Sequence, residues 1–343
     1  MRYIAGILVL AVAVWLSLTV AGPTEGDLTT TGGGRQWTSS AQCAECHQQI
    51  YDEWKDSWHA KSWIDEDVRV QSMDFSNKDC IDCHAPQPVF ISGLYKRVLP
   101  RSSRREEGVD CLSCHLLPNG GMAATVTVPG APCNPIATID LQRVDFCATC
   151  HDQHKTVRQW RASEWPDKNE DCISCHMPFR EGNPSLGRVH AMVGGHDIEL
   201  VKSAVELRGT RDADGGVTVE IENIGAGHAF PTDERSRAAD LFWRPAAGAH
   251  VKGGWTHLYR IRDPYRSEPD ILPTLLHARP HEDSLNTMHI DTGPESAGAV
   301  EVALFYKLTP YYRDPTSGDA RHTETVDDPE SDAQLVHLIT VEP

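Results

Sequence analysis

The cysteine spacing constrains this chain more than any other feature. Ten of the 11 cysteines in its 343 residues lie in five copies of one motif, Cys-x-x-Cys-His. On a helical turn, residues i and i+3 share a face, so both thiols can form thioethers with one porphyrin while the histidine at i+4 reaches the iron. The pattern is the attachment signature of c-type haem. The cysteines are Cys43 and Cys46, Cys80 and Cys83, Cys111 and Cys114, Cys147 and Cys150, and Cys172 and Cys175, and the predicted proximal ligands are His47, His84, His115, His151 and His176.

Other uses of paired cysteines explain the pattern less well. Disulfides suit an exported chain but do not require a histidine after every second cysteine. Zinc sites could pair two Cys-x-x-Cys units, yet five units cannot pair evenly. We therefore predict five covalent c-type haems as the cofactors. The remaining cysteine, Cys133, is interpreted as a loop thiol without a role.

The N-terminus predicts export from the cytoplasm. Arg2 is followed by a long apolar run, and residues 1–22 are interpreted as a signal peptide with cleavage after Ala21, or as an uncleaved membrane anchor. Residues 23–40 follow as a linker. The mature part is therefore predicted to be periplasmic or otherwise extracytoplasmic. The net charge of −17 argues against nucleic-acid binding and suits a basic partner surface or solubility alone.

The other histidines decide whether the irons are closed or open. An iron with a second axial ligand suits electron transfer, whereas one with a single protein ligand is open to water or substrate. His59 lies 12 residues beyond His47 on a predicted amphipathic helix. Twelve helical residues span about 18 Å, so we expect His59 to serve a neighbouring haem rather than its own.

Four further histidines are candidate distal ligands. They lie beside a motif histidine, in a Gly-containing run after the last motif, or on a Gly-rich approach, because glycine lets the backbone come close to a bulky ring. These candidates are His154, His190, His196 and His228. The histidines farther along the chain are interpreted as ordinary surface or packing residues, namely His250, His257, His277, His281, His289, His322 and His337.

The sequence pattern of the chain changes near residue 196. Residues 41–195 hold all five motifs and few apolar runs, which predicts a mainly α and irregular pentahaem domain packed on its haems. Residues 196–343 show strand-like alternation separated by Gly, Pro and Asp clusters, which predicts an all-β antiparallel sandwich domain. The expected strands cover residues 216–223, 257–261, 300–306 and 335–341.

Several stretches resemble multihaem cytochromes c of the cytochrome c554 type, which are related in haem packing to hydroxylamine oxidoreductase and pentahaem nitrite reductase. The resemblance rests on W-x-x-S-x-H at Trp54–His59, on C-I-S-C-H-M-P at 172–178, on H-x-x-x-G-G-H at 190–196 and on G-H-A-F-P-T at 227–232. It covers roughly residues 41–235 and implies electron transfer through stacked haems with bis-histidine iron. The C-x-x-C-K motif of pentahaem nitrite reductases does not occur in this chain.

Three functions compatible with the sequence remain. The first is an electron carrier with no catalytic residues of its own, working between a membrane donor and a terminal reductase or other redox partner. The second is an oxidoreductase that acts on a small nitrogen or sulfur compound at one open haem. Trp165 motivates it, because it stands where His59 stands in a repeat of W-x-x-S-x-H. The third is a redox subunit docked into a larger complex through the β domain. Redox proteins that are basic at the contact surface, or membrane-bound, are the expected partners.

Overall fold

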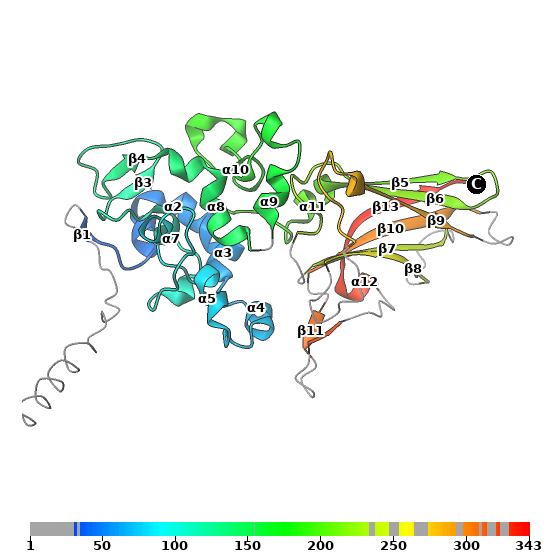
Figure 1. Cartoon of the computed structure of the whole chain (residues 1–343), viewed down its shortest axis with the longest axis horizontal. Helices are drawn as coiled ribbons and strands as arrows, with labels where there is room; N and C mark the ends of the chain where they lie inside the picture. Colours follow the sequence, from blue (N-terminus) through cyan, green and yellow to red (C-terminus); the bar gives the residue numbers. More distant parts are fainter. Residues whose placement is uncertain are drawn as a thin grey trace, which may run out of the picture.

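The computed structural model describes residues 31–32, 35–153, 155–232, 237–246, 254–263, 274–292, 298–308, 311–313, 320–322 and 329–343. Figure 1 shows that the two halves differ in secondary structure, with short helices and loops in the first half and long strands in the second. The predicted combination of a helical, irregular region followed by antiparallel sheet is confirmed at this level.

Short helices dominate the first half. They are α2 (Ala41–Asp56), α3 (Trp58–Lys61), α4 (Glu66–Gln71), α5 (Lys78–His84), α6 (Val89–Ser92), α7 (Cys111–His115), α8 (Val144–His151), α9 (Thr156–Arg161) and α10 (Cys172–His176). Sheet is limited here to the pairs β1 (Thr31–Gly32) with β2 (Arg35–Gln36) and β3 (Met122–Ala124) with β4 (Pro135–Ala137).

The apolar core of this half is divided. Its buried residues form separate clusters of three or four, which are centred on Leu112, Phe75 and Phe146. Helices of one or two turns are not stable alone in water and need a packed surface. The small clusters of buried side chains provide only part of that surface. A bound apolar group such as a porphyrin would supply the rest.

The second half contains two larger antiparallel sheets, besides the short antiparallel pair β11 (Tyr311–Arg313) and β12 (Ala320–His322). One has the order β5 (Val205–Arg211), β6 (Val217–Asn223), β9 (Leu285–Ile290). The other has the order β13 (Gln334–Val341), β10 (Val300–Lys307), β7 (Ala238–Pro245), β8 (Thr256–Ile261). The four strands expected from sequence therefore correspond to β6, β8, β10 and β13, and each prediction is confirmed.

A single large core joins these sheets. Val217, Val219 and Ile221 are fully buried and alternate with partly exposed residues along β6. They meet Leu241 of β7 and Leu304 of β10 in the same cluster. Period-two alternation places one face of each strand inward, so the pattern read from the sequence fixes which side of each strand is buried.

The two halves touch along a seam. The backbone N–H of Glu164 donates to the carbonyl of Arg279 at 2.9 Å. The backbone N–H of Ala229 donates to Oε1 of Gln159 at 3.2 Å. The helix α11 (Ile198–Ala204) leads into β5 at this seam (Figure 1). Residues near 229 and 279 therefore reach back to the motif-bearing half.

Within the described residues, no helix is long and apolar enough to cross a membrane. The apolar run of residues 1–22, predicted as a signal or anchor, lies outside the described residues, as does most of the predicted linker at 23–40.

The buried carboxylate of Asp240 offers a way to test what stabilises the β region. This carboxylate on β7 accepts hydrogen bonds from Arg260 at 2.6 and 2.9 Å and contacts His257 at 3.2 Å. Burial alone would raise the pKa of Asp240, but the hydrogen bonds and charges of His257 and Arg260 outweigh burial and lower it. A lowered pKa stabilises the fold above the unfolded value of about 3.9, and this contribution is lost as the pH falls through the folded value.

We predict that Asp240→Asn lowers the free energy of unfolding at pH 7 by on the order of 3 kcal/mol, because Arg260 loses its buried partner. Denaturant titrations across pH should show the gap between variant and wild type shrinking below roughly pH 4. As a control, Glu206→Gln changes an exposed ion pair and should cost less than about 1 kcal/mol. A gap that is constant with pH would contradict the assignment.

Candidate haem-binding site

Each motif lies on a helix that places its two cysteines one turn apart. The helices α5, α7, α8 and α10 all end at the motif histidine. The first motif lies inside the longer α2, where the backbone breaks from helical geometry at His47, with φ −121° and ψ 45°. In all five motifs the helix is therefore interrupted at the histidine or directly after it. The residues that follow do not continue the helix past the imidazole.

Side-chain caps hold two of these one-turn helices in place. Asp110 accepts from the backbone N–H of Ser113 at 2.7 Å, and the Ser113 hydroxyl in turn accepts from the N–H of Asp110. Asp171 and Ser174 repeat this arrangement before the fifth motif. Such capping boxes satisfy otherwise unpaired helix N–H groups, so the sequence D-C-x-S-C-H encodes its own helix start.

A buried arginine fixes the third motif. Arg101 is 3% exposed and donates to the carbonyl of Pro86 and to the Ser113 hydroxyl, both at 2.9 Å. Its guanidinium lies 3.6 Å from the Asp110 carboxylate, which also pairs with Arg104 at 3.0 Å. A buried charge is tolerated only when it is paired and hydrogen-bonded. The start of α7 is therefore held from several directions.

Contacts between thiols show which motifs are neighbours. Cys43 contacts Cys111, Cys83 contacts Cys150, and Cys147 contacts Cys172. The backbone N–H of Cys111 also donates to the Ser40 hydroxyl just before the first motif, at 3.1 Å. Cys114 packs in one apolar cluster with Cys150. The first motif thus lies beside the third, and the fourth lies beside the second, third and fifth.

The thiols do not assemble into metal cages. None of the 11 cysteines forms a disulfide, and among the described residues no group of three or more metal-ligating atoms includes a motif cysteine. The donor set fits one tetrapyrrole per motif and not a shared zinc site.

Three motif histidines face a second histidine from elsewhere in the chain. The ring centres of His151 and His59 are 5.9 Å apart, those of His115 and His190 6.4 Å, and those of His176 and His228 6.2 Å. Two imidazoles that bind one metal from opposite sides, each at about 2 Å from its nitrogen, have ring centres roughly 6 Å apart. These separations fit an iron between each pair.

The second ring nitrogen of most of these histidines is bound to a backbone carbonyl. The Nδ1 atoms of His84, His115, His176, His190 and His228 lie 2.5–3.0 Å from the carbonyls of Ser62, Ala123, Val193, Arg188 and Ala229. A metal-bound histidine typically donates its other N–H to a carbonyl, which fixes ring and tautomer. The Nε2 atoms are thereby assigned to the iron side.

Burial also keeps the candidate distal rings neutral. It lowers the pKa of His59 to about 3 and that of His228 to about 4, and it lowers the pKa of His190. A neutral imidazole has the lone pair that a metal needs. At neutral pH these rings are therefore ready to act as ligands.

His59 is held differently from the other rings. Its Nδ1 contacts the sulfur of Met192, which lies in the 190–196 run and has a left-handed φ of 47°. A thioether is a weaker acceptor than a carbonyl. The sequence reading of this run considered only its histidines and missed Met192.

Two other positioning residues were not apparent from the sequence. Glu53 of α2 accepts from the backbone N–H of His190 at 2.8 Å and pairs with Arg180 at 2.6 Å, so it fixes the loop that carries His190. Asn223 at the end of β6 donates to the carbonyls of His228 and Leu276 at 2.9 and 3.2 Å. Both residues act through the backbone, which a side-chain pattern does not reveal.

Gly227 explains how the His228 loop comes so close to the motif half. A Cβ at this position would lie 3.0 Å from Trp160 and 3.2 Å from Trp165. Trp165, which replaces histidine in the second copy of W-x-x-S-x-H, therefore packs against this loop. A side chain at residue 227 would require these rings or the loop to shift by a few tenths of an ångström.

Among the described residues, His47 and His196 are not brought into such pairs. His196 stacks on Trp58, with ring centres 3.5 Å apart, and its Nε2 lies 3.1 Å from Nη2 of Arg237. His154 lies outside the described residues. His47 is exposed, and the ring of His84 contacts Phe75. Distal ligation by His154 and His196 stays a prediction.

Comparisons with known proteins bear on the class to which this chain is similar. Residues 42–116, which contain the first three motifs, match the family model "Cytochrome c554 and c-prime". A solved penta-haem cytochrome c552 from Thermochromatium tepidum is similar in structure, with a TM-score of 0.58 and 19% sequence identity over 89% of this chain and 98% of that chain. The comparison with curated proteins finds no match.

The five motifs, the family match over residues 42–116 and the similar fold together support a multihaem c-type cytochrome. Within that class, the predicted resemblance to the cytochrome c554 type is confirmed.

Removal of one distal candidate should open one iron. We predict that His228→Ala adds one high-spin ferric haem to the electron paramagnetic resonance (EPR) spectrum and binds about one carbon monoxide per chain after reduction, because a six-coordinate iron becomes five-coordinate. His289→Ala is the matched control and should keep the wild-type spectrum, since His289 pairs with Asp212 in the β region. If His228→Ala is spectroscopically unchanged, or if His289→Ala becomes high-spin as well, the pairing is wrong.

Proposed function

We propose that this protein is an electron carrier with five covalently bound c-type haems, most of them ligated by two histidines. The observation that carries the proposal is the set of three opposed histidine pairs, whose ring centres lie 5.9–6.4 Å apart. Two protein ligands close an iron to substrate and suit it to electron transfer. When bound, haem supplies a one-electron iron couple.

The order of the motifs in space supports a continuous path. The thiol contacts link the first motif to the third and the fourth to the second and fifth. The cluster that contains Cys114 and Cys150 links the third motif to the fourth. Every motif therefore has a direct neighbour, and the fourth motif is a branch point.

The protein residues have defined roles in this proposal. The ten motif cysteines fix each porphyrin covalently, and the motif histidines bind the irons from one side. His59, His190 and His228 bind from the other side for the fourth, third and fifth motifs. Histidine on both sides favours low potentials, because methionine is the axial ligand that raises them.

The cellular setting is proposed from the sequence. The apolar N-terminus supports an extracytoplasmic, periplasmic location, with a membrane anchor if residues 1–22 are retained. The proposed partners are a membrane-bound electron donor and a terminal reductase or other redox protein that is basic where it docks. The net charge of −17 supports such a partner through long-range attraction.

A second candidate function is oxidoreduction of a small nitrogen or sulfur compound at one open haem. It is favoured by His47, which is exposed and which, among the described residues, has no second histidine ring in contact. A haem on the first motif with only this ligand would present an open iron at the surface.

Carbon monoxide separates these two functions. For the carrier we expect only low-spin ferric EPR signals and no carbon monoxide shift of the reduced optical spectrum, since no iron has a vacant position. Total haem, measured as the pyridine complex, should give five per chain. A high-spin signal with a carbon monoxide shift in the wild type would contradict the closed carrier, and turnover of nitrite, hydroxylamine and sulfite should then be measured.

Charge steering makes a second prediction. Electron transfer to a small basic cytochrome should slow by about tenfold or more between 10 and 200 mM salt, because attraction between opposite charges is screened beyond roughly 10 Å at 0.1 M. Stopped-flow mixing measures the rate, and an acidic redox partner of similar potential is the control, with a rate that rises with salt. A rate to the basic partner that is independent of salt would contradict acidic docking.

A further inference from the structure

A short loop of the β region brings the side chains of two histidines and one aspartate close to one another. Residues 277–283, His-Ala-Arg-Pro-His-Glu-Asp, precede β9. The backbone N–H of His277 donates to the carbonyl of Asp283 at 3.0 Å and so closes the loop on itself. The N–H of His281 donates to the carbonyl of Ala278 at 3.2 Å. The loop is therefore ordered by its own backbone before any ligand binds.

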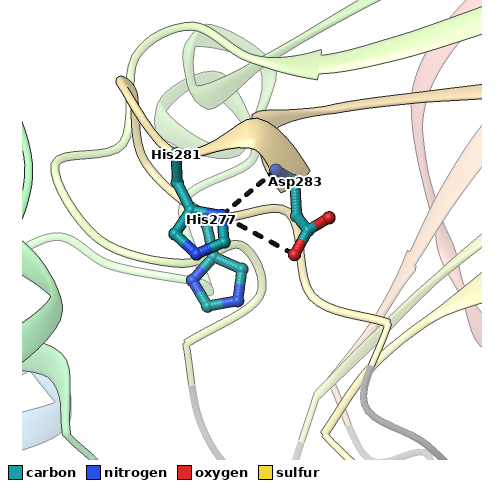
Figure 2. A group of neighbouring side chains, drawn as sticks. All are labelled: His277, His281 and Asp283. Atoms are coloured by element: carbon teal, nitrogen blue, oxygen red, sulfur yellow. Dashed lines mark hydrogen bonds and ion pairs between the residues drawn. The ribbon is translucent and has the colours of Figure 1, made fainter.

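The side chains of His277, His281 and Asp283 point toward one another on this loop, as Figure 2 shows. One ligand atom from each of His277, His281 and Asp283 lies within 4.8 Å of the other two. Nδ1 of His281 and Oδ2 of Asp283 are 3.6 Å apart, and the two imidazole rings have centres 4.2 Å apart. Ligand atoms about 2.1 Å from a tetrahedral ion are roughly 3.4 Å from one another, so small side-chain rotations would complete the site.

The neighbouring charges permit a cation. Arg279 lies inside the loop, but its guanidinium pairs with Glu222, with Nε 2.9 Å from Oε1. Its positive charge is thereby balanced by a carboxylate outside the loop. Nδ1 of His281 accepts the backbone N–H of Asp283 at 3.1 Å, and metal binding at this atom would replace that hydrogen bond. The cost of one such bond is about 1 kcal/mol, far less than a metal–imidazole site supplies.

We propose that His277, His281 and Asp283 bind one divalent transition-metal ion of the zinc type, with a fourth position for water. Two imidazoles and one carboxylate are a zinc donor set, and they bind copper(II) more tightly still. Magnesium and calcium require mainly oxygen ligands and would not be held. The site is separate from all five haem motifs and does not depend on the proposed electron transfer.

The ion would stiffen the seam between the two halves. Leu276, directly before His277, exchanges backbone hydrogen bonds with Phe230 at 2.8 and 3.0 Å. Phe230 follows His228 by two residues, and the carbonyl of Arg279 accepts from Glu164 in the motif half. A metal on this loop therefore fixes the segment that leads to His228.

The second cluster of this kind provides a matched control. Asp212, Asp214 and His289 also lie within ligand distance of one another in the same sheet region. His289 pairs with Asp212 at 3.0 Å and is about half exposed. Two of its three ligands are exposed or partly exposed carboxylates, and nothing else points to an ion there.

The test uses the haem-loaded full-length protein after chelator treatment and dialysis. Isothermal titration with zinc chloride should show one ion per chain and a rise in unfolding temperature, because an ion that binds only the folded state stabilises it. His277→Ala and Asp283→Asn should each weaken binding by about tenfold or more and abolish the temperature rise. Asp283→Asn keeps the backbone bonds of the loop, so its loss of binding cannot be ascribed to unfolding.

His289→Ala should bind zinc as the wild type does. With copper(II) as the probe, the EPR spectrum should show coupling to two imidazole nitrogens in the wild type and to one in His277→Ala. Wild-type protein that takes up no zinc, or binding lost in His289→Ala and retained in His277→Ala, would overturn the proposal.

Discussion

The opposed imidazole pairs are the constraint on which the rest of the structure depends. Two rings can share an iron only when both are held about 6 Å apart with their Nε2 atoms facing inward. The motif histidine is fixed by its own helical turn, but its partner comes from a remote segment. Three such partners converge here, and the loops that carry them are fixed by backbone hydrogen bonds and by partly buried ion pairs such as that of Glu53 with Arg180.

The β region then has a direct part in the site. His228 sits on the loop between β6 and β7, and Asn223 and the Phe230–Leu276 bridge hold that loop. The large apolar core beneath these strands gives the loop a rigid base. A ligand on a rigid scaffold can be placed with the precision that a distal position requires. The sheets therefore position His228, the proposed distal ligand of the fifth motif, in addition to any role in docking.

The sequence predicted the parts of this structure that are local. Each motif helix follows from one-turn spacing, and the strands follow from period-two alternation, as in Val217, Val219 and Ile221. His59 was predicted to serve another motif because a helix carries it away from His47, but its pairing with His151 depends on long-range packing. His196 has the same local signal as His190, yet it stacks on Trp58. The spacing of the histidines in the sequence does not distinguish a paired ring from a stacked one. The positions of His196 and His190 are decided by residues from elsewhere in the chain, Arg237 for His196 and Glu53 for His190.

The acceptors behind the rings make the sites chemically unequal. Five rings have Nδ1 at a backbone carbonyl, whereas His59 has it at the sulfur of Met192. A strong acceptor raises the basicity of a ligating imidazole, and a weak one leaves the ring a poorer electron donor to the metal. His59 faces the fourth motif, which contacts three others. In the proposed electron path, the fourth motif therefore differs from the others in the acceptor behind its second histidine.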